Sequence, residues 1–158
     1  MINIRNANES DANTILQFIK ELAEYEKMSN DVTATEELLK ENIFVKKLAE
    51  VVIAEEDNIP VGFALFFHNF STFLGKGGIY LEDLYVKPSM RNKGVGKKLL
   101  KYLANLAVER DCGRLEWSCL DWNEPSIAFY KERGATPMDE WTVYRVTGEN
   151  LVNLANKD

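Results

Sequence analysis

The stretch RNKGVGKKLL, residues 91–100, places two glycines and several basic residues where an apolar helical pattern begins. Backbone N–H groups in the first turn of a helix have no partner inside the helix, and the helix dipole makes that end attractive to anions. Gly94 and Gly96 let a phosphate approach the backbone closely, because glycine has no Cβ. The basic residues that would supply counter-charge are Arg91, Lys93, Lys97 and Lys98. The stretch therefore predicts a phosphate or pyrophosphate site, although a plain glycine turn with solvated lysines has the same spacing.

Two common nucleotide-binding motifs do not fit this loop. A P-loop ends in Gly-Lys-Ser/Thr, which is absent here, and the dinucleotide motif GxGxxG fails because Leu99 stands in the place of the third glycine. The mismatches argue against an NTPase and against a dehydrogenase.

Glu82 is a second candidate for chemistry. It lies inside the otherwise apolar strand pattern of residues 77–87, which leads to the glycine loop. A carboxylate there can attract a cationic amine and accept or relay its proton. Strand alternation predicts that Glu82 and Asp83 point to opposite faces of a sheet. A solvated strand charge is the alternative interpretation.

The composition of the chain limits which classes of protein it can belong to. The chain has 158 residues and a formal net charge of −6, which suggests one soluble domain and argues against a nucleic-acid partner. Cys112 and Cys119 fit neither a CxxC nor a zinc pattern, so reduced thiols in the cytoplasm are expected. The polar N-terminus lacks a signal-peptide core, and the longest apolar run, residues 61–67, is far below the ~20 residues of a membrane helix, so no membrane partner is expected. His68 is the single histidine, which leaves little material for histidine triads or metal sites.

The elements that must position these residues follow from periodicity and from cap residues. Expected strands cover Ile2–Asn6, Glu50–Glu55, Val61–His68, Gly77–Lys87, Arg114–Leu120 and Trp141–Thr147. Expected helices run from about Asp11 to Tyr25, Thr35 to Phe44, Val95 to Arg110 and Glu124 to Arg133. The order predicts an α/β fold with a mostly antiparallel first half and a central βαβ crossover.

Beyond these patterns, RNKGVG resembles the R/Q-x-x-G-x-G/A acetyl-CoA loop of the GNAT superfamily of N-acetyltransferases. Residues 79–96 and 119–135, together with IKELAEYE at residues 19–26, are similar to its diamine (spermidine/spermine) and thialysine N-acetyltransferase branch. The resemblance implies one acetyltransferase domain over residues 1–158, a mixed sheet with helices on both faces, acetyl-CoA as co-substrate without a metal, and a homodimer.

The resemblance also implies a coenzyme site in a cleft between two splayed strands, Tyr80–Val86 and Leu115–Leu120. The pantetheine arm would pair with backbone like an added strand, and a backbone amide would polarise the thioester carbonyl. The coenzyme-binding residues would be Leu84, Tyr85, Val86, Arg91, Asn92, Lys93, Gly94, Val95, Gly96, Lys97, Asn123 and Ser126.

For catalysis, the resemblance assigns Tyr130 as the general acid for the departing thiolate and Glu82 as the group that helps deprotonate the amine through water. Spacing alone would make Tyr130 a core aromatic. The substrate-binding residues would be Tyr25, Glu26, Thr72, Asp83 and Glu140. In the spermidine/spermine enzymes an acid stands where this chain has Thr72, so a small diamine or lysine-like amine is favoured over spermine.

Three functions are therefore compared. The first is direct acetyl transfer to a small amine, without an acyl-enzyme on either cysteine. The second is transfer to a protein or peptide amine, and the third is a non-catalytic coenzyme A sensor on the same fold. Glu82 and Tyr130 favour an enzyme, because a binder needs no general acid at the sulfur.

Overall fold

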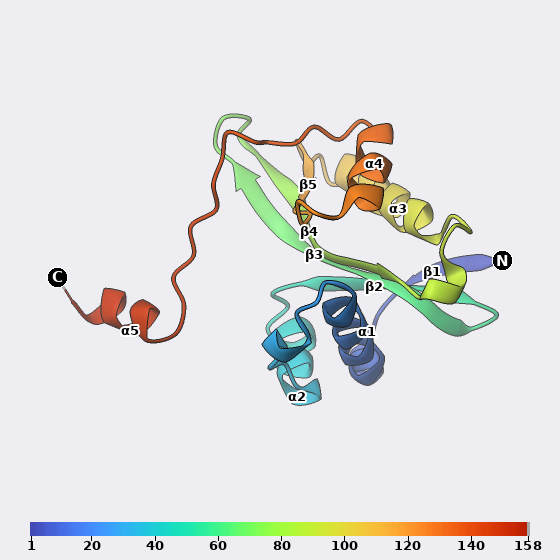
Figure 1. The fold of residues 1–158 in the computed structure, drawn as a ribbon, viewed down its shortest axis with the longest axis horizontal. Coiled ribbons are helices and arrows are strands. Elements are labelled where there is room, and N and C mark those ends of the chain that lie inside the picture. Colours follow the sequence, from blue (N-terminus) through green and yellow to red (C-terminus); the bar gives the residue numbers. More distant parts are fainter. Residues whose placement is uncertain (158) are drawn as a thin grey trace. The chain divides into compact units, whose positions relative to one another are not determined.

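A computed structural model describes residues 1–157 and contains one five-stranded sheet in the order β1-β2-β3-β4-β5. The strands are β1 (Ile2–Asn6), β2 (Glu50–Glu56), β3 (Ile59–Ser71), β4 (Lys76–Val86) and β5 (Leu115–Trp117). Strands β1 to β4 pair antiparallel, whereas β4 and β5 pair parallel, so the segment between them is the predicted crossover. Figure 1 shows helix α1 (Ala12–Tyr25) on one face of this sheet and helix α3 (Val95–Glu109) on the other. The predicted α/β class with a mostly antiparallel sheet is confirmed.

The chain divides into two compact units, Met1–Ser118 and Cys119–Asp158, and the sheet belongs to the first. The second unit contains helix α4 (Glu124–Glu132) and helix α5 (Gly148–Asn156). Its α4 agrees with the predicted helix, since Pro125 lies in the first turn and Gly134 follows the last with a φ of 89°.

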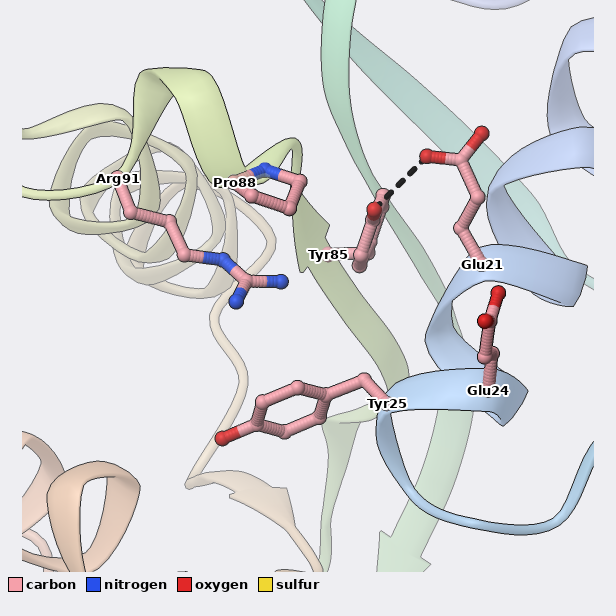
Figure 2. Close-up of a pocket in the computed structure, with 6 residues that line it drawn as sticks. All are labelled: Glu21, Glu24, Tyr25, Tyr85, Pro88 and Arg91. Atoms are coloured by element: carbon pink, nitrogen blue, oxygen red, sulfur yellow. Dashed lines mark hydrogen bonds between the residues drawn. The ribbon is translucent and has the colours of Figure 1, made fainter.

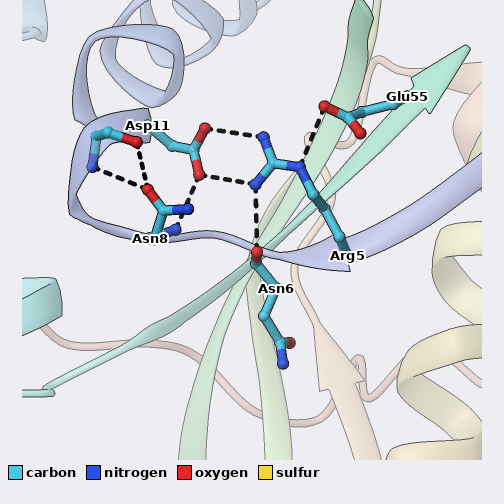
Figure 3. Close-up of polar contacts among 6 residues, drawn as sticks. Arg5, Asn6, Asn8, Asp11 and Glu55 are labelled. Carbon is cyan, nitrogen blue, oxygen red and sulfur yellow. Dashed lines mark hydrogen bonds and ion pairs between the residues drawn. The ribbon is translucent and has the colours of Figure 1, made fainter. Parts of the chain in front are cut away.

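The start of α1 is fixed by a group of paired charges, Arg5, Asp11 and Glu55, which we call the Arg5 network (Figure 3). Arg5 donates to both carboxylate oxygens of Asp11, at 2.8 and 2.9 Å, and its Nε lies 3.1 Å from Glu55. Asp11 also accepts the backbone N–H of Asn8 at 2.8 Å. The hydrogen bond from Arg5 holds the pKa of Asp11 below its usual value, and the same bond raises the pKa of Arg5. The network ties β1 and β2 to the entrance of α1.

The face covered by α1 is an aromatic core. Phe18 of α1 stacks on Phe63 of β3, with ring centroids 5.6 Å apart, and tilts against Tyr85 of β4 at 5.8 Å. Ile15 and Ile53 complete this layer and are fully buried. Because Tyr85 lies near the end of β4, this packing brings the C-terminal half of α1 beside the end of that strand.

On the opposite face, α3 buries Val95, Leu99, Leu103 and Ala107. Residues four apart lie on one side of a helix, so this stripe faces the sheet and the lysines of the first turn stay exposed. The helix begins at Val95, where the sequence pattern predicted it. Its N-terminus therefore lies directly after the glycine loop.

Strand β3 is longer than predicted and β5 ends at Trp117 rather than Leu120, and larger differences concern the second helix and the last strand. The second helix is short, α2 (Glu36–Leu39), and continues as a π-helical segment, η3 (Lys40–Val45). The predicted strand at Trp141–Thr147 is wrong, since residues 141–147 belong to no strand and α5 follows instead. A strand is stable only beside a partner backbone, and no described strand pairs with this segment.

Candidate active site

The end of β4 has an open edge. Strand β5 pairs with β4 only over Ile79–Leu81, so within residues 1–157 no strand covers the outer side of β4 from Glu82 to Val86. An uncovered edge offers backbone N–H and C=O groups to an extended ligand. Leu84, Tyr85 and Val86, the residues predicted to pair with the pantetheine arm, lie along this open edge.

A β-bulge lies at the point where this edge opens. Leu65 of β3 is opposite Asp83, and the next residue, Phe66, is opposite Leu81, so Glu82 is an extra residue without a partner on β3. The simple alternation expected at Glu82 and Asp83 is therefore interrupted. Asp83 lies on the same face as Leu65, which packs against the aromatic core under α1. The bulge thus places Asp83 on the α1 face of the sheet.

Three carboxylates near the bulge influence one another electrostatically, and we call Glu26, Glu82 and Asp83 the acid cluster. Burial raises the pKa of Asp83 to about 6, with further contributions from the charges of Glu82 and Glu26. Burial also raises the pKa of Glu26, which caps the end of α1, and the charge of Glu82 adds to this effect. Within residues 1–157, none of the three carboxylates forms an ion pair or a side-chain hydrogen bond. Like charges held together without a counter-ion favour binding of a cation.

The glycine loop follows the end of the same strand. Gly94 precedes α3 with a φ of 82°, a left-handed conformation that favours glycine, and a Cβ there would meet open space. At Gly96 the nearest atom to a Cβ would be Cγ2 of Val86, at 3.9 Å, so the first turn of α3 passes beside the end of β4. Lys97 and Lys98 stay exposed around this turn. The open helix N-terminus with its basic rim fits the pyrophosphate of acetyl-CoA.

Beside these elements lies a pocket of about 360 Å³ between α1 and the loop after β4 (Figure 2). The residues that line it are Glu21, Glu24, Tyr25, Tyr85, Pro88 and Arg91. The Tyr85 hydroxyl donates to Glu21 at 2.8 Å, and the guanidinium carbon of Arg91 lies 5.0 Å from the ring centre of Tyr25 and 5.7 Å from that of Tyr85. Burial raises the pKa of Tyr85 to about 12, and its hydrogen bond to Glu21 adds to this effect.

The pocket contains residues that sequence reasoning missed. Two of these, Glu21 and Glu24, lie three positions apart, and Glu21 lies four positions before the predicted Tyr25, so helical spacing could have placed them on the same face of α1 as Tyr25. Pro88 gave no signal. Arg91 was expected at the coenzyme, but its guanidinium stacks on Tyr25, a predicted substrate-binding residue.

The other predicted residues are not all brought together. Thr72 is exposed in the turn between β3 and β4. Since β4 rises about 3.3 Å per residue, this turn is roughly 20 Å from Glu82. Asn123, Ser126, Tyr130 and Glu140 belong to the second unit. There Asn123 is the buried N-cap of α4 and Tyr130 contacts Phe129, with ring centroids 5.6 Å apart. Their roles stay predictions.

Comparison with known proteins identifies the family to which this fold and site belong. Residues 15–135 match the Acetyltransferase (GNAT) family. The chain belongs to the GNAT acetyltransferase family. GNAT enzymes use acetyl-CoA, so the chain is an acetyl-CoA-dependent N-acetyltransferase. Among the described residues, none of the helices has the length and hydropathy of a membrane span, and no three His, Cys, Asp or Glu side chains are placed to hold one metal ion.

Several GNAT-like relatives match most of the chain. A thialysine N-epsilon-acetyltransferase of Bos taurus is 40% identical over 166 residues, which cover 98% of this chain and 97% of the relative. An L-ornithine N5-acetyltransferase of Arabidopsis thaliana is 42% identical over 112 residues, covering 71% of this chain and 46% of the relative. The structure of an integron cassette protein from the mobile metagenome of V. cholerae superposes with a TM-score of 0.82 at 30% identity, covering 99% of this chain and 98% of that one.

Proposed function

We propose that this GNAT enzyme acetylates the primary amine of a small cationic molecule by direct transfer. The observation that carries the proposal is the acid cluster, which lies where the open edge of β4 begins. A protonated amine is attracted to three unpaired carboxylates, and the open edge is where an extended coenzyme arm would pair. The two reactants would thus meet at the bulge.

In this proposal the acid cluster performs two tasks. It binds the ammonium ion, and it accepts the proton that the amine must lose before its nitrogen can attack. Asp83, with a pKa of about 6, is ionised at neutral pH and close enough to neutrality to exchange that proton. Glu82 reaches the same region from the bulge and relays the proton through water. Acetyl-CoA, when bound, supplies the activated acetyl thioester.

The proposal also keeps the roles predicted for α4. Tyr130 would hold the proton that the leaving thiolate needs, and Asn123 and Ser126 would contact the coenzyme. The match to the GNAT family runs across both units, which supports a single catalytic domain over residues 1–158. Thr72 would contact only an acceptor longer than a simple diamine, whereas Glu140 stays a predicted partner of the cationic acceptor.

The acceptor is a lysine-like amino acid or a diamine. Relatives named for thialysine and for L-ornithine support the first class. A long polyamine is less favoured, because the turn that carries Thr72 has no acid at that position and lies far along β4 from the acid cluster. Transfer to a protein amine is the competing enzymatic function.

A homodimer in the cytoplasm is part of the proposal. Trp141, Val143 and Tyr144 are at least three-quarters exposed, and α5 exposes Leu151 and Leu154. Large apolar side chains gathered in one segment favour contact with a second copy of the chain. Cys112 and Cys119 are not joined in a disulfide, which suits a reducing compartment. Sedimentation of the purified chain tests the dimer.

The function itself is tested by coenzyme A release from acetyl-CoA with thialysine, lysine, ornithine, putrescine, spermidine, spermine and a lysine peptide, with the products identified by mass spectrometry. Turnover of a small amine supports the proposal. Turnover of the peptide alone would establish the competing function. Tight acetyl-CoA binding without turnover of any amine would indicate a coenzyme A sensor.

A further inference from the structure

We propose that Glu21 and Tyr85 are positioning residues for acetyl-CoA, because together they hold the side chain of Arg91 ready for the coenzyme pyrophosphate. The inference rests on the proposed function and on the coenzyme role predicted for Arg91. It adds α1, which carries Glu26 of the acid cluster, to the elements that determine coenzyme affinity. Figure 2 shows Tyr85 between Glu21 and Arg91.

Glu21 is the fixed end of this chain of contacts. One of its carboxylate oxygens accepts a hydrogen bond from the Tyr85 hydroxyl at 2.8 Å, and the other accepts one from the Gln17 side chain at 3.1 Å. Burial raises the pKa of Tyr85 to about 12, so the phenol keeps its proton at neutral pH and remains a donor. No ion pair within residues 1–157 joins Glu21 to Arg91. The carboxylate therefore acts on the tyrosine and reaches the arginine only through it.

Tyr85 is the middle contact, and its ring is held on both sides. The side chain is buried, and the ring tilts against Phe18 with centroids 5.8 Å apart. The guanidinium carbon of Arg91 lies 5.7 Å from the centre of the same ring. A phenol that donates to a carboxylate is polarised by that hydrogen bond, which makes its ring face more attractive to a cation. Glu21 thus orients the ring and strengthens its contact with Arg91.

Arg91 is held at two further points. Its guanidinium carbon lies 5.0 Å from the ring centre of Tyr25, and its Nε donates to the carbonyl of Val86 at 3.1 Å. Val86 also borders the first turn of α3, since its Cγ2 would be the nearest atom to a Cβ at Gly96, at 3.9 Å. Within residues 1–157, neither terminal nitrogen of Arg91 has an ion pair or a hydrogen bond. The side chain is therefore fixed at the residue that the coenzyme loop passes, with two donors left for phosphate oxygens.

Holding the arginine in advance should affect coenzyme affinity rather than the chemical step. A mobile arginine side chain loses rotamer freedom when it binds a phosphate, and a side chain that is already held loses less. The charge of Glu21 alone has the opposite effect, because a carboxylate near the pyrophosphate repels it. Removing Glu21 therefore separates positioning from plain charge by the sign of the change. Glu24 offers a matched control, since it lines the same pocket and its carboxylate has no hydrogen bond or ion pair with a described residue.

The test measures coenzyme A binding by calorimetry, without an acceptor. Glu21→Ala should weaken binding about 2-fold to 5-fold, the range expected for a cation–π contact at an exposed site, and Tyr85→Phe, which keeps the ring but not the hydroxyl, should weaken it similarly. Glu24→Ala should keep the native Kd or lower it, because it removes only a repelling charge. Arg91→Met should weaken binding about 10-fold to 100-fold, and adding Glu21→Ala to that variant should cause no further loss.

Turnover adds a readout that a general loss of structure would not give. With acetyl-CoA, Glu21→Ala should raise the KM and leave kcat near its native value. With S-acetylpantetheine, which has the thioester and the pantetheine arm but no pyrophosphate, kcat/KM should equal that of the native chain. Equal changes of Kd in Glu21→Ala and Glu24→Ala, a further loss in the Arg91→Met background, or an equal fall with both thioesters overturns the inference. Failure of the proposed function would instead appear as no acetylated amine with any acceptor, while the calorimetric comparison would still decide the role of Glu21.

Discussion

The Arg5 network and the acid cluster each gather carboxylates around the ends of α1, but their electrostatic environments are opposite. In the network, Asp11 and Glu55 share the guanidinium of Arg5, and the pKa of Asp11 is lowered. In the acid cluster no ion pair joins a carboxylate to a described cation, and the pKa values of Glu26 and Asp83 are raised. Burial acts against the charge in both places, so the counter-ion makes the difference.

This contrast separates a structural group from a functional one. A buried carboxylate with a hydrogen-bonded cation is neutralised within the fold and has little left to offer a ligand. A carboxylate that faces only other carboxylates lowers the stability of the free protein, and that repulsion is relieved when a cationic substrate arrives. Under the proposed function the two ends of α1 therefore perform different tasks, and four measurements can test the contrast.

Removing charge from the acid cluster should have the largest effect on activity. Asp83→Asn is expected to lower kcat/KM about 100-fold or more, because the amine loses a binding partner and a proton acceptor. The same change should raise the free energy of unfolding at neutral pH by about 1–2 kcal/mol, since it removes a repelled charge. Steady-state rates and urea unfolding measure the two effects. Asp57→Asn, in the exposed turn between β2 and β3, is the control; a loss of stability in Asp83→Asn would contradict the contrast.

Breaking the Arg5 network should lower stability and leave activity nearly unchanged. Asp11→Asn leaves part of the Arg5 charge unpaired and should lower the free energy of unfolding by about 3 kcal/mol. The kcat of the folded fraction should stay near its native value. Glu9→Gln changes an exposed acid in the same turn and should have little effect on either quantity. A fall in kcat without a fall in stability would mean that the network belongs to the active site.

The pH dependence of stability should have opposite signs at the two places. The folded pKa of Asp11 is lowered, so its stabilisation is present above the usual pKa and is lost as the pH falls through the lower folded value. The folded pKa of Asp83 is raised to about 6 from 3.8, so its ionisation costs stability above pH 6, and this cost disappears as the pH falls from 6 toward 4. Urea unfolding between pH 7 and 4 should show the second effect in the native chain and not in Asp83→Asn.

Salt should affect the acid cluster more than the Arg5 network, and this difference should be smaller than those above. Raising the ionic strength from ~0.05 to ~0.5 M shortens the screening length, which should increase the KM for a cationic amine a few-fold. The free energy contributed by the Arg5 network should change little, because its charges are in direct contact. A KM that does not respond to salt would argue against a role for uncompensated charge in acceptor binding.

The sequence predicted the parts of the site that depend on local rules. Helical spacing and the glycine loop located the start of α3, and the position of Glu82 within an apolar strand pattern made it a candidate functional residue. The bulge was not predictable, because an extra residue on one strand is defined only by the register of its partner. Pairing also decides the fate of Trp141–Thr147, which alternates like a strand but has no partner strand and forms none. The pocket depends on the packing of α1 against the loop after β4, which local sequence rules do not describe.

The bulge at Glu82 affects how the sequence of β4 can change in evolution. Tyr80, Asp83 and Tyr85 pair with Phe67, Leu65 and Phe63, three alternate residues on one face of β3. If Glu82 were deleted, the residues before and after it would still alternate between the two faces of the sheet. Every core residue of β4 would then stay on the face that it now occupies. Glu82 therefore resembles an insertion that gave the sheet a new carboxylate without displacing any residue of the core. A strand can acquire chemistry in this way while its packing stays as it was.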